Sequence, residues 1–276
     1  MRLGAHSFGF VWHEMAARTV ERVADAGFPA IELLGVPGHL DVSTARITVG
    51  ACDSALARTG IELLAVDLPA HDYNLASLDI DAATFSFAAH VRLLEVAADL
   101  GARYATIHGG RRIGLFPPPD DRQYAALRRN FDRLCSEAVR RRVALAIENI
   151  PIALLDTGEA IAAFLSAGGW NDVGVIYDVA NALPAGEDPL AGLRAAGERL
   201  ALVHLSDATP ARPAHDPIGS GTVDFAAIGA QLAEQDFSGW AVLEVAAPDP
   251  LAALVEGRQA LGRAGWRFAQ GMEAGE

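Results

Sequence analysis

The alternation of short apolar runs with longer amphipathic segments constrains the fold of this chain most strongly. Each run is mostly apolar on both of its faces, as are the strands of a buried parallel sheet. The runs fall at residues 3–6, 30–34, 61–66, 104–108, 143–148, 174–178, 201–205 and 240–245. Helical patterns occupy the intervals between them, for example over residues 13–26, 83–100 and 122–142.

The runs and the helical patterns together form one repeated unit. The phrases ADAGFPAIEL, ARTGIELLAV and ADLGARYATI each read as a helix, a glycine stop, a short turn and a strand. Glycine supplies the left-handed residue that ends a helix. Strands that alternate with helices predict a parallel sheet, and eight such units favour a closed barrel over an open doubly wound sheet. No GxGxxG sequence follows the first run, which further disfavours a dinucleotide-binding fold.

We therefore predict an α/β protein with a single (β/α)8 TIM barrel over residues 1–268 and a frayed C-terminal tail over residues 269–276. The length of 276 residues is close to the roughly 250 that are typical of such a barrel. Hydrophobic residues make up 51% of the chain, which is enough for a large core. No change of composition marks a linker or a second domain.

The composition argues against several classes of function. The formal charge of −13 disfavours binding to nucleic acid. All 22 basic residues are arginine, so Schiff-base and P-loop chemistry, which depend on lysine, are excluded. The two cysteines, Cys52 and Cys135, form no disulfide or metal-binding pattern. Because we find neither an apolar leader nor an apolar run of membrane length, we expect a cytoplasmic protein without membrane contact.

The most informative residues are polar side chains at the C-terminal ends of the predicted strands. In a TIM barrel this end carries the active site. The polar residues placed there, or just beyond, are His6, His71, His108, Glu148, Asp178, His204 and Glu244. One histidine at such a position is more often a hydrogen-bonded core residue than a ligand. Seven polar residues at the same end of successive strands favour a shared site over separate structural roles.

Three of these residues are carboxylates that would meet at one barrel mouth. A buried carboxylate without a partner is costly, and a divalent cation would relieve the mutual repulsion at once. We therefore predict one metal site built from Glu148, Asp178, His204 and Glu244. An oxygen-rich set with one imidazole favours Mn²⁺, with Mg²⁺, Co²⁺ and Zn²⁺ as alternatives.

At these residues the sequence resembles the xylose-isomerase-like TIM barrels. This group includes sugar-phosphate isomerases and epimerases, ketose 3-epimerases, inosose dehydratases and endonuclease IV. The matching segments cover nearly the whole chain and are LGAHSF, HDYNLAS, ATIHGG, LAIEN, YDVAN, LVHLSD, HDPIGSGTVDF and GWAVLEV. The resemblance implies the same four metal ligands. It also implies that Glu148 and Glu244 act as acid and base on opposite faces of a substrate.

Two positions depart from the pattern of the endonucleases in this group. Endonuclease IV has a larger, three-metal site, and three of its additional histidines match His71, His108 and His215. It has a histidine where this chain has Asn181 and an aspartate where this chain has Pro213. These departures favour a one-metal enzyme over a DNA-repair enzyme. Many epimerases also contact their substrate with a histidine at the position of Asn181, so the resemblance leaves the substrate open.

The resemblance implies a metal-dependent isomerase or epimerase of a small sugar or polyol-derived carbonyl compound. Glu148 and Glu244 would transfer a proton at the carbon α to the carbonyl, and which of them is the base stays open. The residues expected to contact the substrate are His6, His71, His108, Asn181, Arg212 and His215. Arg212 is equally compatible with a solvated position in its loop.

Three other functions stay open. The same enolate could expel a β-hydroxyl, which would make the protein a dehydratase of an inosose-like keto-polyol. An abasic-site endonuclease and a non-catalytic metal- or sugar-binding barrel are the others, because one barrel fold hosts many activities. Relatives in the group suggest a homodimer or a homotetramer.

Overall fold

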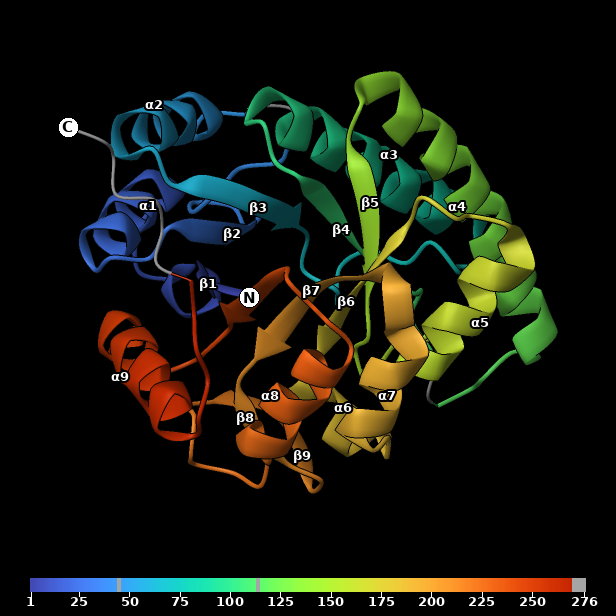
Figure 1. Ribbon diagram of the computed structural model, residues 1–276. Coiled ribbons are helices and arrows are strands. Elements are labelled where there is room, and N and C mark those ends of the chain that lie inside the picture. Colours follow the sequence, from blue (N-terminus) through green and yellow to red (C-terminus); the bar gives the residue numbers. More distant parts are fainter. Residues whose placement is uncertain (44–45, 113–114, 270–276) are drawn as a thin grey trace.

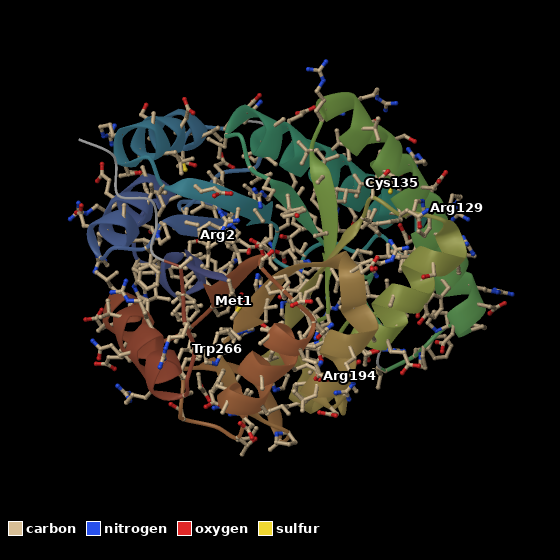
Figure 2. The ribbon with its side chains drawn as sticks, viewed as in Figure 1. Met1, Arg2, Arg129, Cys135, Arg194 and Trp266 are labelled. Atoms are coloured by element: carbon tan, nitrogen blue, oxygen red, sulfur yellow. The ribbon has the colours of Figure 1, made fainter. Side chains whose placement is uncertain are left out.

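The computed structural model describes residues 1–43, 46–112 and 115–269. It shows a closed barrel of eight parallel strands with helices around it (Figure 1), which confirms the predicted fold. Neighbouring strands follow the order β1-β10-β7-β6-β5-β4-β3-β2. Except for Ala269, the predicted tail over residues 269–276 lies outside the described residues. The backbone N–H of Ala269 donates to the backbone oxygen of Met1, which Figure 2 labels beside Arg2, at 3.0 Å.

The barrel strands lie within one or two residues of the apolar runs that predict them. They are β1 (Arg2–His6), β2 (Ala30–Leu34), β3 (Glu62–Asp67), β4 (Tyr104–His108), β5 (Ala144–Glu148), β6 (Gly174–Asp178), β7 (Leu200–Leu205) and β10 (Trp240–Leu243). Most residues of these strands are buried, as expected of a parallel sheet that is covered on both faces.

The helices surround the barrel in chain order. They are α1 (Ala16–Asp25), α2 (Val49–Thr59), α3 (Ile80–Asp99), α4 (Asp120–Arg141), α5 (Gly158–Gly168), α6 (Val179–Ala185), α7 (Pro189–Ala196), α8 (Phe225–Glu234) and α9 (Pro250–Arg263), with short 3-10 turns η1 (Phe8–Phe10) and η2 (Gly197–Arg199). Gly27, Gly60 and Gly101 follow α1, α2 and α3 with φ values of 77°, 66° and 70°, which confirms the predicted glycine stops. In the described ranges, no helix has both the length and the apolar surface needed to cross a membrane.

Apolar side chains fill the part of the barrel interior where the strands begin. Ala30, Leu64, Leu202 and Trp240 belong to this cluster, and each is at most 2% exposed. The guanidinium group of Arg2 lies 4.2 Å from the centre of the Trp240 ring, so its charge stays at the rim. Because this end is filled with apolar groups, the polar side chains of the interior gather at the C-terminal ends of the strands.

An antiparallel hairpin, which the apolar pattern does not predict, follows β7. Its strands are β8 (Asp207–Thr209) and β9 (Arg212–Asp216), and it packs against α6 (Figure 1). The buried Asp207 holds the loop after the hairpin, because its carboxylate accepts hydrogen bonds from the backbone N–H groups of Gly219 at 2.8 Å and Val223 at 3.1 Å. A Cβ atom at Gly221 would lie 2.4 Å from Asp207 Oδ1, so only glycine fits there. The hairpin carries His215 to the barrel mouth.

Asn149, directly after β5, joins two strand ends at the mouth. Its Nδ2 donates to the backbone oxygen of Asp178 at 3.0 Å, and its Oδ1 accepts from the backbone N–H of Asp178 at 2.7 Å. The side chain is fully buried. These two bonds fix the end of β6 relative to the end of β5.

We predict that Asn149→Ala lowers the free energy of unfolding by about 2–6 kcal/mol, because it leaves the backbone N–H and oxygen of Asp178 unpaired and each such buried group costs about 1–3 kcal/mol. Urea denaturation measures this change. The matched variant Gln259→Ala, at an exposed position of α9, should stay within about 0.5 kcal/mol of wild type. If both variants lost the same free energy of unfolding, the hydrogen bonds of Asn149 would not stabilise the protein as proposed.

Candidate metal centre

Four ionisable side chains meet at the C-terminal mouth of the barrel. Glu148 and Asp178 end β5 and β6, His204 lies near the end of β7, and Glu244 directly follows β10. Each of the four residues is at most 6% exposed. One oxygen or nitrogen atom from each lies within 4.8 Å of those from the others. The structure thus brings together the four residues that are predicted to hold a metal ion.

The imidazole of His204 lies between two glutamates. Its Nδ1 atom is 3.2 Å from Glu148 Oε1 and 3.0 Å from Glu244 Oε2. Burial disfavours the charged form of the ring, but the carboxylates of Glu32 and Glu244 outweigh burial and raise the pKa of His204 well above its usual value. In the protein alone, a proton on His204 therefore offsets part of the negative charge of the glutamates.

The two oxygens of Asp178 have different roles. Oδ1 caps α6, where it accepts hydrogen bonds from the backbone N–H groups of Ala180 at 2.7 Å and Asn181 at 2.9 Å. Oδ2 is buried and has no hydrogen-bond partner. Burial, and after it the charges of Glu244 and Glu148, raise the pKa of this carboxyl from 3.8 to about 7 against the opposing effect of a nearby histidine.

These donors fit a divalent cation. Glu244 Oε2, like Asp178 Oδ2, makes no hydrogen bond, although His204 Nδ1 is only 3.0 Å away. Buried carboxylate oxygens without partners are rare, and a cation within the cluster would satisfy both of them. Three carboxylates and one imidazole suit Mn²⁺, Mg²⁺, Co²⁺ and Zn²⁺ and do not distinguish among them.

Two of the predicted substrate-contacting histidines adjoin the glutamates of this centre. His108 Nε2 lies 3.2 Å from Glu148 Oε2, and His6 Nδ1 lies 3.7 Å from Glu244 Oε1. Burial opposes the charged form of Glu148, but hydrogen bonds from His108 and His204 lower its pKa from 4.5 to about 2. Glu148 is therefore a carboxylate at neutral pH.

A third predicted contact, His215, reaches the centre from β9. Its Nδ1 atom lies 3.5 Å from Asp178 Oδ2 and 3.1 Å from Ser206 Oγ. The ring of Phe8, from the turn after β1, lies 5.0 Å from the His215 ring, centre to centre. The mouth thus combines polar groups with one aromatic side.

Among the described residues, the structure shows no hydrogen bond or ion pair between the side chains of the other three predicted contacts and those of the four ligands. His71 is exposed beside the mouth, in a surface pocket. Arg212 is paired with Asp216 at 3.0 Å and its side chain is 65% exposed, which favours the solvated-loop interpretation. Asn181 is buried in the first turn of α6, where its backbone N–H donates to Asp178. A substrate contact by any of these three residues stays a prediction.

Two buried acids that are not among the predicted site residues lie next to the centre. Glu32, in the middle of β2, is 0% exposed, and Asp67, at the end of β3, is 6% exposed. An oxygen of each and a nitrogen of His6 form a second group of possible ligand atoms within 4.8 Å of one another. The sequence did carry a signal, since Glu32 interrupts an apolar run and Asp67 directly follows the run that ends at residue 66.

The chain belongs to the xylose isomerase-like TIM barrel family, whose pattern matches residues 20–264. The rhizopine catabolism protein MocC of Rhizobium meliloti is 28% identical over 225 residues, which cover 71% of this chain and 68% of that protein. An inosose dehydratase of Geobacillus kaustophilus is 30% identical over 122 residues, which cover 36% of this chain and 38% of the dehydratase. The chain thus matches well under two thirds of the dehydratase's length.

Several solved structures share the whole fold. The 3-keto-D-glucoside 4-epimerase YcjR of E. coli has a TM-score of 0.79 at 19% identity, with 95% of this chain and 99% of that chain covered. An L-ribulose 3-epimerase has a TM-score of 0.80 at 21% identity, with 95% and 94% covered. A putative xylose isomerase from Rhodospirillum rubrum has a TM-score of 0.84 at 16% identity, with 95% and 99% covered. At these identities the likeness establishes the fold.

Asp178→Asn should separate metal binding from helix capping. Asparagine keeps an oxygen that can cap α6, but it replaces Oδ2 with an NH₂ group that cannot bind a cation. We expect calorimetric titration to show no Mn²⁺ binding, while the melting temperature without metal equals or exceeds that of wild type because a buried carboxyl is removed. Asp178→Ala also loses the cap and should be less stable by about 1 kcal/mol. Wild-type Mn²⁺ affinity in Asp178→Asn would contradict this assignment.

The affinity for metal should rise with pH, because the cation and the proton compete for the same ligands. Without metal, Asp178 has a pKa of about 7 and His204 has a raised pKa, so both hold protons in mildly acidic solution. Metal binding must displace these protons, so the affinity should be low below pH 7 and should keep rising above it. Mn²⁺ titrations from about pH 6 to about pH 8 measure this trend. A dissociation constant that is constant over this range would refute it.

Proposed function

We propose that this protein is a metal-dependent isomerase or epimerase of a small sugar or polyol-derived carbonyl compound. The observation that supports this most is the convergence of Glu148 and Glu244 on His204 Nδ1, at 3.2 Å and 3.0 Å. Their strands, β5 and β10, are three positions apart in the order of the closed barrel. The two carboxylates therefore come from different sides of the mouth, so a substrate between them would present opposite faces of its α carbon to them.

In this mechanism the metal would polarise the substrate and the side chains would transfer the proton. A divalent cation held by Glu148, Asp178, His204 and Glu244 supplies a Lewis acid that polarises the substrate carbonyl. Glu148, with its pKa lowered to about 2, is ready to accept a proton from the α carbon. The pKa of Glu244 is also lowered, because nearby histidines outweigh burial, so either glutamate can act as the base. The other glutamate, in its protonated form, would return a proton from the opposite face and so invert that carbon. Isomerisation would instead need a proton at the neighbouring, former carbonyl carbon, together with transfer of the α-hydroxyl proton to the former carbonyl oxygen.

The surroundings of the centre suit a hydroxylated substrate. His6, His108 and His215 place imidazole nitrogens near the carboxylates, where they can hydrogen-bond hydroxyl groups. Phe8 offers an apolar surface beside them, as binding sites for small molecules often do. The formal charge of −13 argues against a nucleic-acid substrate. We therefore propose a small neutral sugar or keto-polyol, acted on in the cytoplasm.

A dehydratase of an inosose-like keto-polyol is the second candidate. It is favoured by the 30% identity to an inosose dehydratase over 122 residues. The first step would be the same removal of the α proton. The electron pair of the resulting enolate would then expel the β-hydroxyl, which leaves as water after a protonated side chain donates a proton to it. Product mass distinguishes the two candidates, because an epimer keeps the mass of the substrate and the dehydration product loses one water.

Glu148→Gln and Glu244→Gln should each reduce the exchange of the substrate's α proton with solvent by at least about 100-fold, since the amide can neither take up nor return the proton. The measurement is deuterium incorporation in D₂O, over a panel of ketoses and inososes with metal at saturating concentration. The matched Glu256→Gln variant, at an exposed position of α9, is the control and should keep the wild-type exchange. Exchange at the wild-type rate in both glutamine variants would refute the mechanism.

A further inference from the structure

Glu32 is a fully buried acid that the proposed chemistry does not use. It lies in the middle of β2 at 0% exposure. Its Oε2 atom is 2.8 Å from His204 Nε2, and its Oε1 atom accepts a hydrogen bond from Thr106 Oγ1 at 2.9 Å. In the described part of the chain, its ionic contacts are to imidazoles and not to arginine. A carboxylate held this deeply needs a specific role for its charge.

We propose that Glu32 is the positioning residue that orients His204 toward the metal, an inference that rests on the metal centre proposed above. A carboxylate only accepts hydrogen bonds, so it keeps a proton on His204 Nε2. The lone pair for a cation is then on Nδ1, which is the nitrogen that faces Glu148 and Glu244. Histidines that bind metals commonly donate their other N–H to a carboxylate in this way.

The contact also fixes the position of the ring across the barrel. Glu32 lies on β2, Thr106 on β4 and His204 on β7, and none of these strands is a neighbour of another in the barrel order. The hydrogen bonds from Thr106 to Glu32 and between Glu32 and His204 therefore connect three separate parts of the wall. With Thr106 on one carboxylate oxygen and the imidazole on the other, neither side chain can rotate without leaving a buried polar group unpaired.

A second metal ion is the main competing explanation for Glu32. His6 Nε2 lies 4.0 Å from Glu32 Oε1 and 3.7 Å from Asp67 Oδ1, a spacing that could hold a cation. However, the backbone N–H of Phe8 donates to His6 Nδ1 at 3.0 Å, so the proton of the neutral ring is on Nε2. A protonated Nε2 has no lone pair for a cation. His6 Nε2 and Asp67 Oδ1 also lack hydrogen-bond partners, but an N–H on Nε2 faces the Asp67 carboxylate at 3.7 Å and offsets its charge without a cation. The geometry therefore favours a single ion, at the centre that His204 faces.

The test is Glu32→Gln, which keeps the size of the side chain but removes its charge and its restriction to accepting hydrogen bonds. We expect the Kd for Mn²⁺, measured by competition with a chelator, to weaken by about 10–100-fold. Asp67→Asn is the matched control, because it also neutralises a buried acid near the centre, but one that pairs with His6 and, within the residues that the structure describes, makes no hydrogen bond or ion pair with His204. Its Kd should stay close to that of wild type. Thr106→Val removes only the hydrogen bond that Thr106 donates to Glu32. Its Kd for Mn²⁺ should lie between those of Glu32→Gln and Asp67→Asn.

Two further measurements test the protonation of His204 and the number of bound ions. In the Zn²⁺-loaded wild-type protein, proton NMR should show a downfield, exchange-protected Nε2–H signal of His204, and this signal should move upfield or disappear in Glu32→Gln. Ion counting should give one bound ion per chain. An unchanged Kd in Glu32→Gln, or two ions per chain of which one is lost in that variant, would overturn the role of Glu32 but not the proposed centre. A wild-type protein that binds none of Mn²⁺, Mg²⁺, Co²⁺ and Zn²⁺ would overturn both.

Discussion

The concentration of buried negative charge at one end of the barrel is the constraint on which the rest of this structure depends. Glu148, Asp178 and Glu244 lie within a few ångströms of one another with almost no access to water. Such a group is stable only if protons, imidazoles or a cation offset its charge. The raised pKa of Asp178 and the raised pKa of His204 are two results of this one constraint, since both groups keep protons that would otherwise be lost.

The same residues hold the local structure and the site in place together. Asp178 ends β6, begins α6 by capping it with Oδ1, and leaves Oδ2 free for the centre. Asn149 ties its backbone to β5. Hydrogen bonds to its Oδ1 atom and to its backbone therefore hold Asp178 in place while Oδ2 faces the other carboxylates.

Much of the fold and part of the site are predictable from the sequence. Apolar runs identify every barrel strand to within two residues, because strands buried on both faces need a continuous apolar pattern. The hairpin β8–β9 escapes this pattern, because it is held by the buried carboxylate of Asp207 and by close packing at Gly221, not by apolar alternation. Glu32 interrupts an apolar run, but its partners are not predictable from the sequence, because Thr106 and His204 are far away from it along the chain.

The sequence by itself determined which polar residues end the strands, because the chain's apolar periodicity leaves few other places where Glu148, Asp178, His204 and Glu244 can lie. Only the tertiary structure decided how they face one another. Barrel closure brings β5 and β10 to one mouth, and the contact with Glu32 selects which nitrogen of His204 faces the carboxylates. Side-chain direction depends on contacts between distant segments, and local sequence patterns do not encode those contacts.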